Sequence, residues 1–175
     1  MRSPSKTLRR SLVTIAALAA LLVAPRAATA DDARAPFESL GRAARVECAS
    51  TATSSNLSCQ LVESIAACKR GDADACEVVG RVNMTRDVHD VPRATATPFF
   101  LLRACSLAPA KCVGLVPVAM RRLGDPDLAL ALLDEGCTRS VGVCRVAASM
   151  YVVGRAVPSD DAIAWSFTQR AAKAR

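Results

Sequence analysis

Aromatic side chains are almost missing from this chain of 175 residues. One Trp, one Tyr and four Phe make up 3% of the sequence. The hydrophobic core must therefore be built from small aliphatic side chains, chiefly Ala, Leu and Val. Such a core suits closely packed helices better than a β-sandwich, whose strands favour β-branched and aromatic residues. The expected fold class is all-α.

The chain also lacks an apolar run long enough to cross a bilayer. Its longest, Ser11 to Ala24, has about 14 residues, whereas a spanning helix needs about 20. A small-residue cleavage site, Ala28-Thr29-Ala30, follows this run, and four basic residues precede it: Arg2, Lys6, Arg9 and Arg10. This pattern is typical of a cleaved signal peptide over residues 1–30 and favours it over an N-terminal anchor. We expect an exported protein, periplasmic or extracellular, with no membrane span after cleavage.

Little net charge remains once the signal peptide is removed. The full chain carries a formal charge of +7, but residues 1–30 hold five Arg or Lys and no acid, which leaves 18 basic and 16 acidic residues. A net charge near +2, with no aromatic residues placed among clustered basic ones, does not indicate a nucleic-acid-binding surface. Nucleic acid is therefore not an expected partner.

Catalytic and metal-binding patterns are equally scarce. The single histidine, His89, lies between Asp87 and Asp90, and the only Ser-x-x-Lys, Ser3 to Lys6, falls inside the expected signal peptide. Neither Lys-Thr-Gly nor Gly-x-Ser-x-Gly occurs, so the serine β-lactamase machinery is incomplete. Asp87/Asp90 and Asp134/Glu135 are interpreted as surface or helix-end carboxylates. We expect no catalytic residue, no metal ion and no cofactor, and keep His89 as the one residue to follow.

Eight cysteines are the most informative feature that is present. Their even number in an exported chain predicts a disulfide framework. Zinc sites usually have two to four residues between ligands, whereas the gaps here hold six, seven or ten residues. Disulfides are therefore favoured over metal. The expected local pairs are Cys68–Cys76, Cys105–Cys112 and Cys137–Cys144, with Cys48–Cys59 as the remaining pair outside the repeat period.

The spacing within these pairs constrains the backbone. Seven residues of uninterrupted helix separate two Cα atoms by roughly 10 Å, beyond the ~7 Å that a disulfide spans. The chain must therefore reverse between the cysteines, at Gly71-Asp72, at Pro109-Ala110 and at 138–140. A stack of antiparallel helix pairs follows, with each of these turns stapled.

Periodicity and helix-end signals divide the chain between these turns. Pro98 is expected in the first turn of its helix and Pro117 at a kink, while Asp125 and Asp160-Asp161 should cap the helices that follow them. Trp165 and Phe167 are interpreted as a hydrophobic lid on the last helix. The expected helices cover, approximately, residues 37–48, 57–70, 73–84, 98–108, 111–123, 128–137, 141–153 and 162–175.

Successive pairs begin 37 and then 32 positions apart, a period typical of tetratricopeptide-class solenoids. Ala67-Cys68 with Gly71 to Cys76, Ala104-Cys105 with Cys112, and the loop from Tyr151 to Ala162 resemble the cysteine-rich branch of the Sel-one-like repeat family, the group of the Helicobacter cysteine-rich proteins. The resemblance covers roughly 57–175. The departures from it are two six-residue cysteine gaps where seven is usual, Ala156 in place of the second loop glycine, and Ala172 at a staple position.

The resemblance implies a short α/α solenoid over 57–175, after a signal peptide (1–30) and an N-terminal helix with a Ser/Thr-rich loop (31–56). Its implied function is a scaffold for protein or peptide binding, with ligand-binding residues unknown. An alternative implied by the same group is an envelope binder or weak hydrolase of β-lactam or peptidoglycan-like ligands. A domain without any retained ligand is the third interpretation.

Overall fold

The computed structural model describes residues 30–50, 57–85 and 93–173. Most of the expected signal peptide, the Ser/Thr-rich loop and His89 with Asp87 and Asp90 lie outside these residues. The described chain is helical throughout, apart from short turns and one longer loop. Its elements are α1 (Ala30–Ser50), α2 (Leu57–Lys69), α3 (Ala73–Thr85), α4 (Arg93–Leu107), α5 (Pro109–Val118), η1 (Ala119–Leu123), α6 (Pro126–Arg139), α7 (Val141–Val153) and α8 (Asp161–Lys173).

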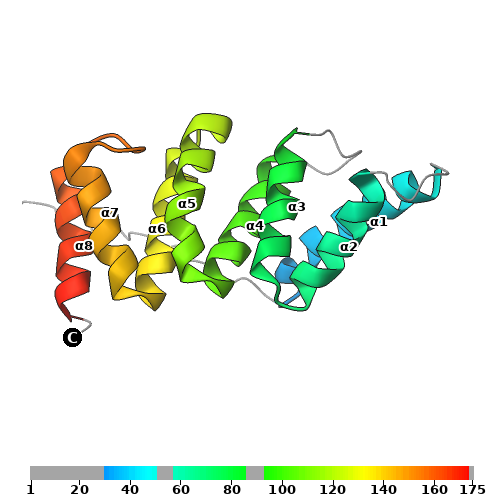
Figure 1. The fold of residues 1–175 in the computed structure, drawn as a ribbon, viewed down its shortest axis with the longest axis horizontal. Helices are drawn as coiled ribbons and strands as arrows, with labels where there is room; N and C mark the ends of the chain where they lie inside the picture. Colours follow the sequence, from blue (N-terminus) through cyan, green and yellow to red (C-terminus); the bar gives the residue numbers. More distant parts are fainter. Residues whose placement is uncertain (1–29, 51–56, 86–92, 174–175) are drawn as a thin grey trace, which may run out of the picture.

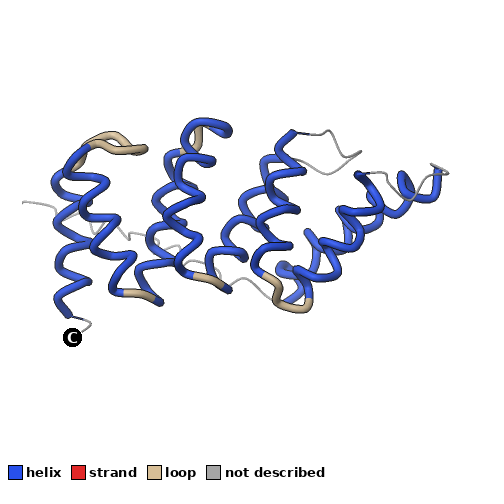
Figure 2. The backbone as a smooth tube through the Cα atoms, in the orientation of Figure 1, coloured by secondary structure: helices blue, strands red, loops and turns tan. Residues whose placement is uncertain are grey.

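Sequential antiparallel pairs make up the fold, as the cysteine spacing predicts. The helices follow one another along the long axis of the molecule, from α1 at one end to α8 at the other (Figure 1). Short turns join α2 to α3, α4 to α5 and α6 to α7 at one edge of the stack. The connections after η1 and α7 lie at the opposite edge (Figure 2). We call these the short-turn edge and the long-loop edge.

Two of the three reversals are tighter than the sequence indicated. The α4–α5 reversal takes place at Ala108 alone, so Pro109 already belongs to the first turn of α5. The α6–α7 reversal takes place at Ser140 alone, because α6 continues through Arg139. Only the α2–α3 turn has three residues, with Gly71 in the left-handed region at φ 101°. The one-residue turns explain why two cysteine pairs are separated by seven positions and the third by eight.

Aspartates begin several helices, and the two capping predictions are confirmed. Asp125 accepts a hydrogen bond from the backbone N–H of Leu128 at 2.8 Å, and Asp160 accepts one from Ile163 at 2.9 Å. Asp72 does the same for Ala75 at 3.0 Å. Each carboxylate satisfies a backbone donor that the first helical turn would otherwise leave free.

Proline positions bring one correction. Pro98 does not open its helix, because α4 begins at Arg93 and Pro98 lies inside it. The turn before Pro98 is held by packing: Ala96 is buried, and the Thr97 hydroxyl accepts a hydrogen bond from the buried Asn83 amide of α3 at 3.0 Å. This packing outweighs the backbone hydrogen bond that the proline removes. Helix α1 likewise begins before the expected Phe37 and includes Pro36.

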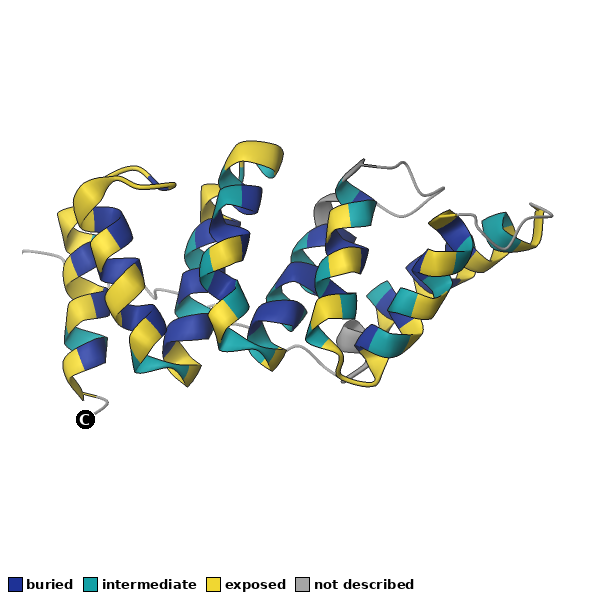
Figure 3. Cartoon of the chain, in the orientation of Figure 1, coloured by how far each residue is buried: buried dark blue, intermediate teal, exposed yellow. Residues whose placement is uncertain are grey.

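Small side chains form much of the core, as the composition predicts. Nine buried alanines lie beside larger residues such as Leu101, Leu115 and Leu132, and the buried positions face inward along the length of the stack (Figure 3). Five of the six aromatic side chains form two groups, one between α1 and α4 and the other between α7 and α8. Phe37, Phe99 and Phe100 meet edge to face, and Tyr151 stacks on Phe167.

The prediction that Trp165 and Phe167 form a hydrophobic lid is wrong for Trp165. Phe167 is fully buried, but Trp165 remains 64% exposed. Residues two positions apart on a helix point in nearly opposite directions, so the two rings cannot share one face of α8. Phe167 therefore closes the stack with Ala164 and Ala171, while Trp165 faces solvent.

Four disulfides join neighbouring helices across their turns. They pair Cys48 with Cys59, Cys68 with Cys76, Cys105 with Cys112 and Cys137 with Cys144, at Cα separations of 4.5–4.8 Å. The last three lie at the short-turn edge. No described cysteine is free. Four disulfides in a chain of this size indicate an oxidising, extracytoplasmic environment.

Replacing both Cys105 and Cys112 with Ala should lower the free energy of unfolding by about 2–3 kcal/mol, the chain-entropy contribution of a loop this short. The helical content at 10 °C should stay unchanged, because the helices pack through aliphatic side chains. Urea unfolding followed by far-ultraviolet circular dichroism measures both quantities. An unchanged unfolding midpoint would contradict a stabilising role for this bridge.

Two glycines should respond in opposite directions to replacement by Ala. A Cβ at Gly136 would meet Cys112 Sγ at 2.7 Å and Val143 Cγ1 at 2.8 Å, whereas one at Gly114 would meet nothing within 4 Å. G136A should therefore lower the free energy of unfolding by about 1–3 kcal/mol through overpacking. G114A should raise it by about 0.5–1 kcal/mol, since Ala favours the helix. Equal shifts in the two melting temperatures would contradict the packing at Gly136.

Candidate functional site

An apolar hollow lies between α5 and α7. Its volume is about 440 Å³, within the range of small-ligand sites. Most of its lining is aliphatic, from Val113, Pro117, Val146, Met150, Val153 and Ala156, and Ser149 and Arg155 are its polar members. Val146 and Val153 are 42% and 70% exposed. Solvent-facing apolar side chains are thus concentrated at the rim of a concave surface.

A second hollow, of about 570 Å³, lies between α3 and α5 and has a different character. Arg81 comes from α3, and Arg121 and Arg122 come from η1; Gly114, Pro117 and Val118 complete the lining. Arg81 pairs with Glu77 at 2.8 Å. Arg121 and Arg122 make no ion pair or side-chain hydrogen bond with any part of the chain that the structure describes. This hollow presents positive charge without a lining carboxylate.

The local sequence of α5 and η1 builds the junction between the two hollows. Pro117 lines both of them, and its ring nitrogen has no hydrogen to donate to the carbonyl of Val113. Two residues later the backbone widens into the π-helical turn η1, and Gly124, with φ 63°, follows this turn as its C-cap. Such turns are rare in helices and frequent at functional sites. The wide turn carries Arg121 and Arg122 at the long-loop edge.

Polar contacts link neighbouring repeats below these hollows. Lys111 of α5 pairs with Glu77 at 2.8 Å and with Asp74 at 2.5 Å, both on α3. Burial opposes ionisation of Glu77, but hydrogen bonds from Lys111 and Arg81 prevail and lower its pKa. The Asp74 and Glu77 carboxylates raise the pKa of Lys111. The network fixes the spacing of α3 and α5, and with it the width of the arginine-lined hollow.

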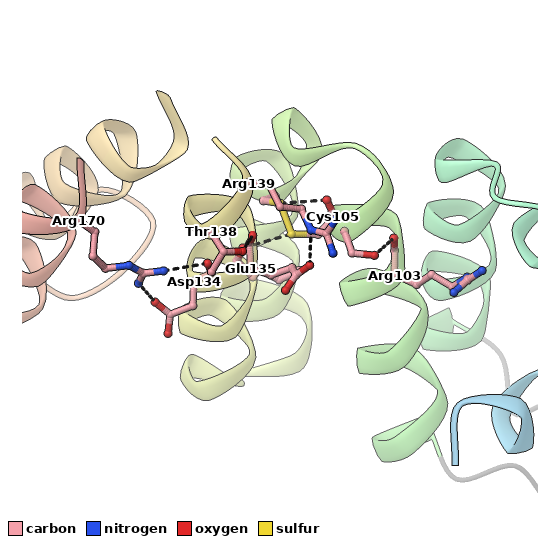
Figure 4. The surroundings of a disulfide bond; sticks show 10 residues. Arg103, Cys105, Asp134, Glu135, Thr138, Arg139 and Arg170 are labelled. Carbon is pink, nitrogen blue, oxygen red and sulfur yellow. Dashed lines mark hydrogen bonds and ion pairs between the residues drawn. A yellow bond between two sulfur atoms is a disulfide. The ribbon is translucent and has the colours of Figure 1, made fainter. Parts of the chain in front are cut away.

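A corresponding link joins α6 to α8. Arg170 pairs with the carboxylate of Asp134 and donates a hydrogen bond to the backbone carbonyl oxygen of Asp134 at 3.2 Å (Figure 4). The Arg170 guanidinium also lies over the ring of Phe167. On α6 itself, Arg139 pairs with Glu135 at 2.7 Å. Asp134 and Glu135 are therefore engaged in ion pairs, in agreement with their interpretation as surface and helix-end residues.

The pKa of the nearby Tyr151 is raised, mainly because its side chain is buried and to a smaller extent because of the Asp134 carboxylate.

The site residues named from the sequence divide into three groups. All eight cysteines lie in bridges, and Asp134 and Glu135 lie in ion pairs. His89, Asp87 and Asp90 fall outside the described residues. The hollows themselves were missed. The adjacent arginines Arg121 and Arg122 do not by themselves indicate a hollow. The available signals are the helix-interior Pro117 and the helical Gly114, where a Cβ would meet nothing within 4 Å.

Comparison with known proteins adds no relative. No family model matches the chain, and searches of curated proteins and of solved structures find no significant match either. Within 30–50, 57–85 and 93–173, no cluster of three or more His, Cys, Asp or Glu side chains could hold a metal ion. Among the helices described, none is both long and apolar enough to cross a membrane. The geometry of the two hollows is therefore the basis for assigning a function.

Replacing Glu77 with Gln should lower the free energy of unfolding by about 1 kcal/mol at pH 7, as for a partly buried ion pair. Because folding lowers the pKa of Glu77, its contribution is present above the unfolded value near 4.5 and is lost as the pH falls through the folded value. The gap between wild type and E77Q should therefore close below about pH 4.5. Urea unfolding at pH 3, 5 and 7 measures it, with E63Q on the exposed face of α2 as the control. A gap that persists at pH 3 would contradict the ion-pair role.

Proposed function

We propose that this chain is an exported helical-repeat scaffold that binds a peptide, or a peptide segment of a protein, on the face formed by α3, α5 and α7. The observation that carries the proposal is the pair of adjoining hollows on either side of Pro117. Helical solenoids bind extended segments on surfaces of this kind. The two hollows together offer both apolar contact and charge.

The helix pairs are, on this proposal, degenerate Sel-one-like repeats. Support comes from the antiparallel order of the helices and from a disulfide at each of the three short turns. The loop after α7 adds to it. Gly154 has φ 70°, and Ala156, which stands where the family has a second glycine, adopts φ 65°. A left-handed backbone at both positions is what the glycines of the family's loop pattern would favour.

Export is the third part of the proposal. The signal-peptide pattern in residues 1–30 supports secretion, and the disulfides agree with an oxidising compartment. The scaffold would then act in the periplasm or outside the cell. Its partner is a protein or peptide of the same compartment.

Peptide display tests the proposal directly. Residues 31–175, with the disulfides formed, should enrich a set of peptides from a random library over an unrelated protein. The enriched peptides should lose at least tenfold in affinity for G114W, because the indole would fill the α3–α5 hollow from a position where a Cβ meets nothing. G142W is the matched control: Gly142 is also an exposed helical glycine, near the short-turn edge.

Failure to enrich any peptide would contradict the proposed function. Enriched peptides that bind G114W and wild type equally would place the binding surface elsewhere on the stack. Circular dichroism of both tryptophan variants should match the wild type, since both sites are open to solvent.

A further inference from the structure

We propose that the segment bound by this face combines an apolar side chain with a nearby carboxylate. The apolar side chain occupies the α5–α7 hollow, and the carboxylate binds the arginines of the α3–α5 hollow. This inference rests on the proposed function and specifies the chemistry of its partner. The reasons are the lining of each hollow, their separation and the distribution of charge around them.

The α5–α7 hollow fits one aliphatic or aromatic side chain. Its volume of about 440 Å³ exceeds that of any single residue, and its lining includes the partly exposed Val146 and the largely exposed Val153. Covering these valines would remove apolar surface from water, the main favourable term in association. Val152, the neighbour of Val153 on α7, is equally exposed at 62% but does not line the hollow. Val152 therefore serves as a comparison for Val153, because the two differ in whether they line the hollow.

The arginines supply the second contact. Arg121 and Arg122 have no ion-pair partner in the described parts of the chain, and Arg155 extends the positive charge to the rim of the apolar hollow. Guanidinium groups bind carboxylates through paired, charge-assisted hydrogen bonds. Neither hollow is lined by an acidic residue. Charge complementarity therefore selects an acidic partner and disfavours a basic one.

The distance between the hollows sets the spacing in the partner. The two hollows lie on opposite sides of α5 and share Pro117. A helix with its side chains is about 10 Å across, and an extended chain advances about 3.3 Å per residue. The carboxylate should therefore lie about three residues from the apolar anchor, in either chain direction.

A second copy of the chain is a poorer occupant. Two copies related by a two-fold axis would oppose the same patch, and here that patch carries Arg81, Arg121, Arg122 and Arg155. Arginine would face arginine without a lining carboxylate between them. A separate acidic segment has no such conflict.

Fluorescence polarisation with labelled ten-residue peptide libraries tests the inference. One library fixes Leu or Phe with Asp or Glu three residues away, on either side. In three matched libraries the acid is replaced by its amide, the acid is moved to eight residues away, or the apolar anchor is replaced by Ser. The first should bind residues 31–175 at least tenfold more tightly than each of the others, the difference expected for loss of one charged hydrogen-bonded contact.

Surface variants then locate the two contacts. R122E should weaken the first library at least tenfold and remove its preference over the amide library, and V153D should remove its preference over the Ser library. The matched controls are R70E, at the short-turn edge, and V152D, beside Val153; both should leave the affinities unchanged. All four positions are exposed, so each variant should keep the melting temperature of the wild type.

The outcomes separate this inference from the proposed function. Equal binding of the acidic and amide libraries would overturn the inference and leave peptide binding intact. No binding of any library, together with failed peptide selection, would overturn both. A concentration-dependent dimer in sedimentation that V153D or R122E disperses would identify a second copy as the occupant and overturn the acidic-segment assignment.

Discussion

The disulfide at each short turn is the constraint on which the stacking of the repeats depends. Short helices are marginal by themselves, and the core that joins them is built largely from alanine and leucine. A bridge between the end of one helix and the start of the next holds that pair together. Gly136 illustrates the dependence, because only a residue without a side chain lets the Cys105–Cys112 bridge lie against α6.

Polar contacts between neighbouring repeats add a second restraint, and they recur at nearly the same spacing along the chain. Lys111 bonds to Glu77 across 34 positions, Arg103 bonds to the Cys68 carbonyl across 35, and Arg170 bonds to the Asp134 carboxylate across 36. Each joins an element to its equivalent in the next repeat. The first holds α3 beside α5, so the spacing at the short-turn edge determines how far apart the helices stand at the hollows.

The fold was largely predictable from the sequence, because its determinants are local. Cysteine spacing and aspartate caps act over a few residues, and with the apolar periodicity they located the eight described α-helices, although α1 and α4 begin earlier than predicted. Pro98 shows where local signals fail, since tertiary packing of Ala96 and Thr97 outweighed the helix-breaking residue. The prediction for Trp165 is wrong for a different reason: this residue lies on the solvent-facing side of α8, opposite the buried Phe167.

The candidate site was less predictable because it depends on residues brought together from different repeats. Arg81 and Arg122 are distant in sequence and share a hollow only because α3 and α5 are parallel neighbours. Val153 and Pro117 meet in the same way across α5 and α7. A pair of adjacent arginines in a sequence resembles any solvated surface. Only the packing of the helices shows that the face beside them is concave and that neither hollow is lined by an acidic residue.

Because every disulfide joins cysteines that are close together in the sequence, the chain can change in length without breaking one. Each cysteine has its partner within eleven positions, and the three staples at the short-turn edge never cross a long-loop connection. A segment cut from one long-loop connection to the next therefore carries whole disulfides and leaves no half-cystine behind. Segments bounded in this way can be duplicated or deleted by recombination without leaving an unpaired, reactive cysteine. The architecture thus permits the length of the helical stack to vary while its covalent framework stays intact.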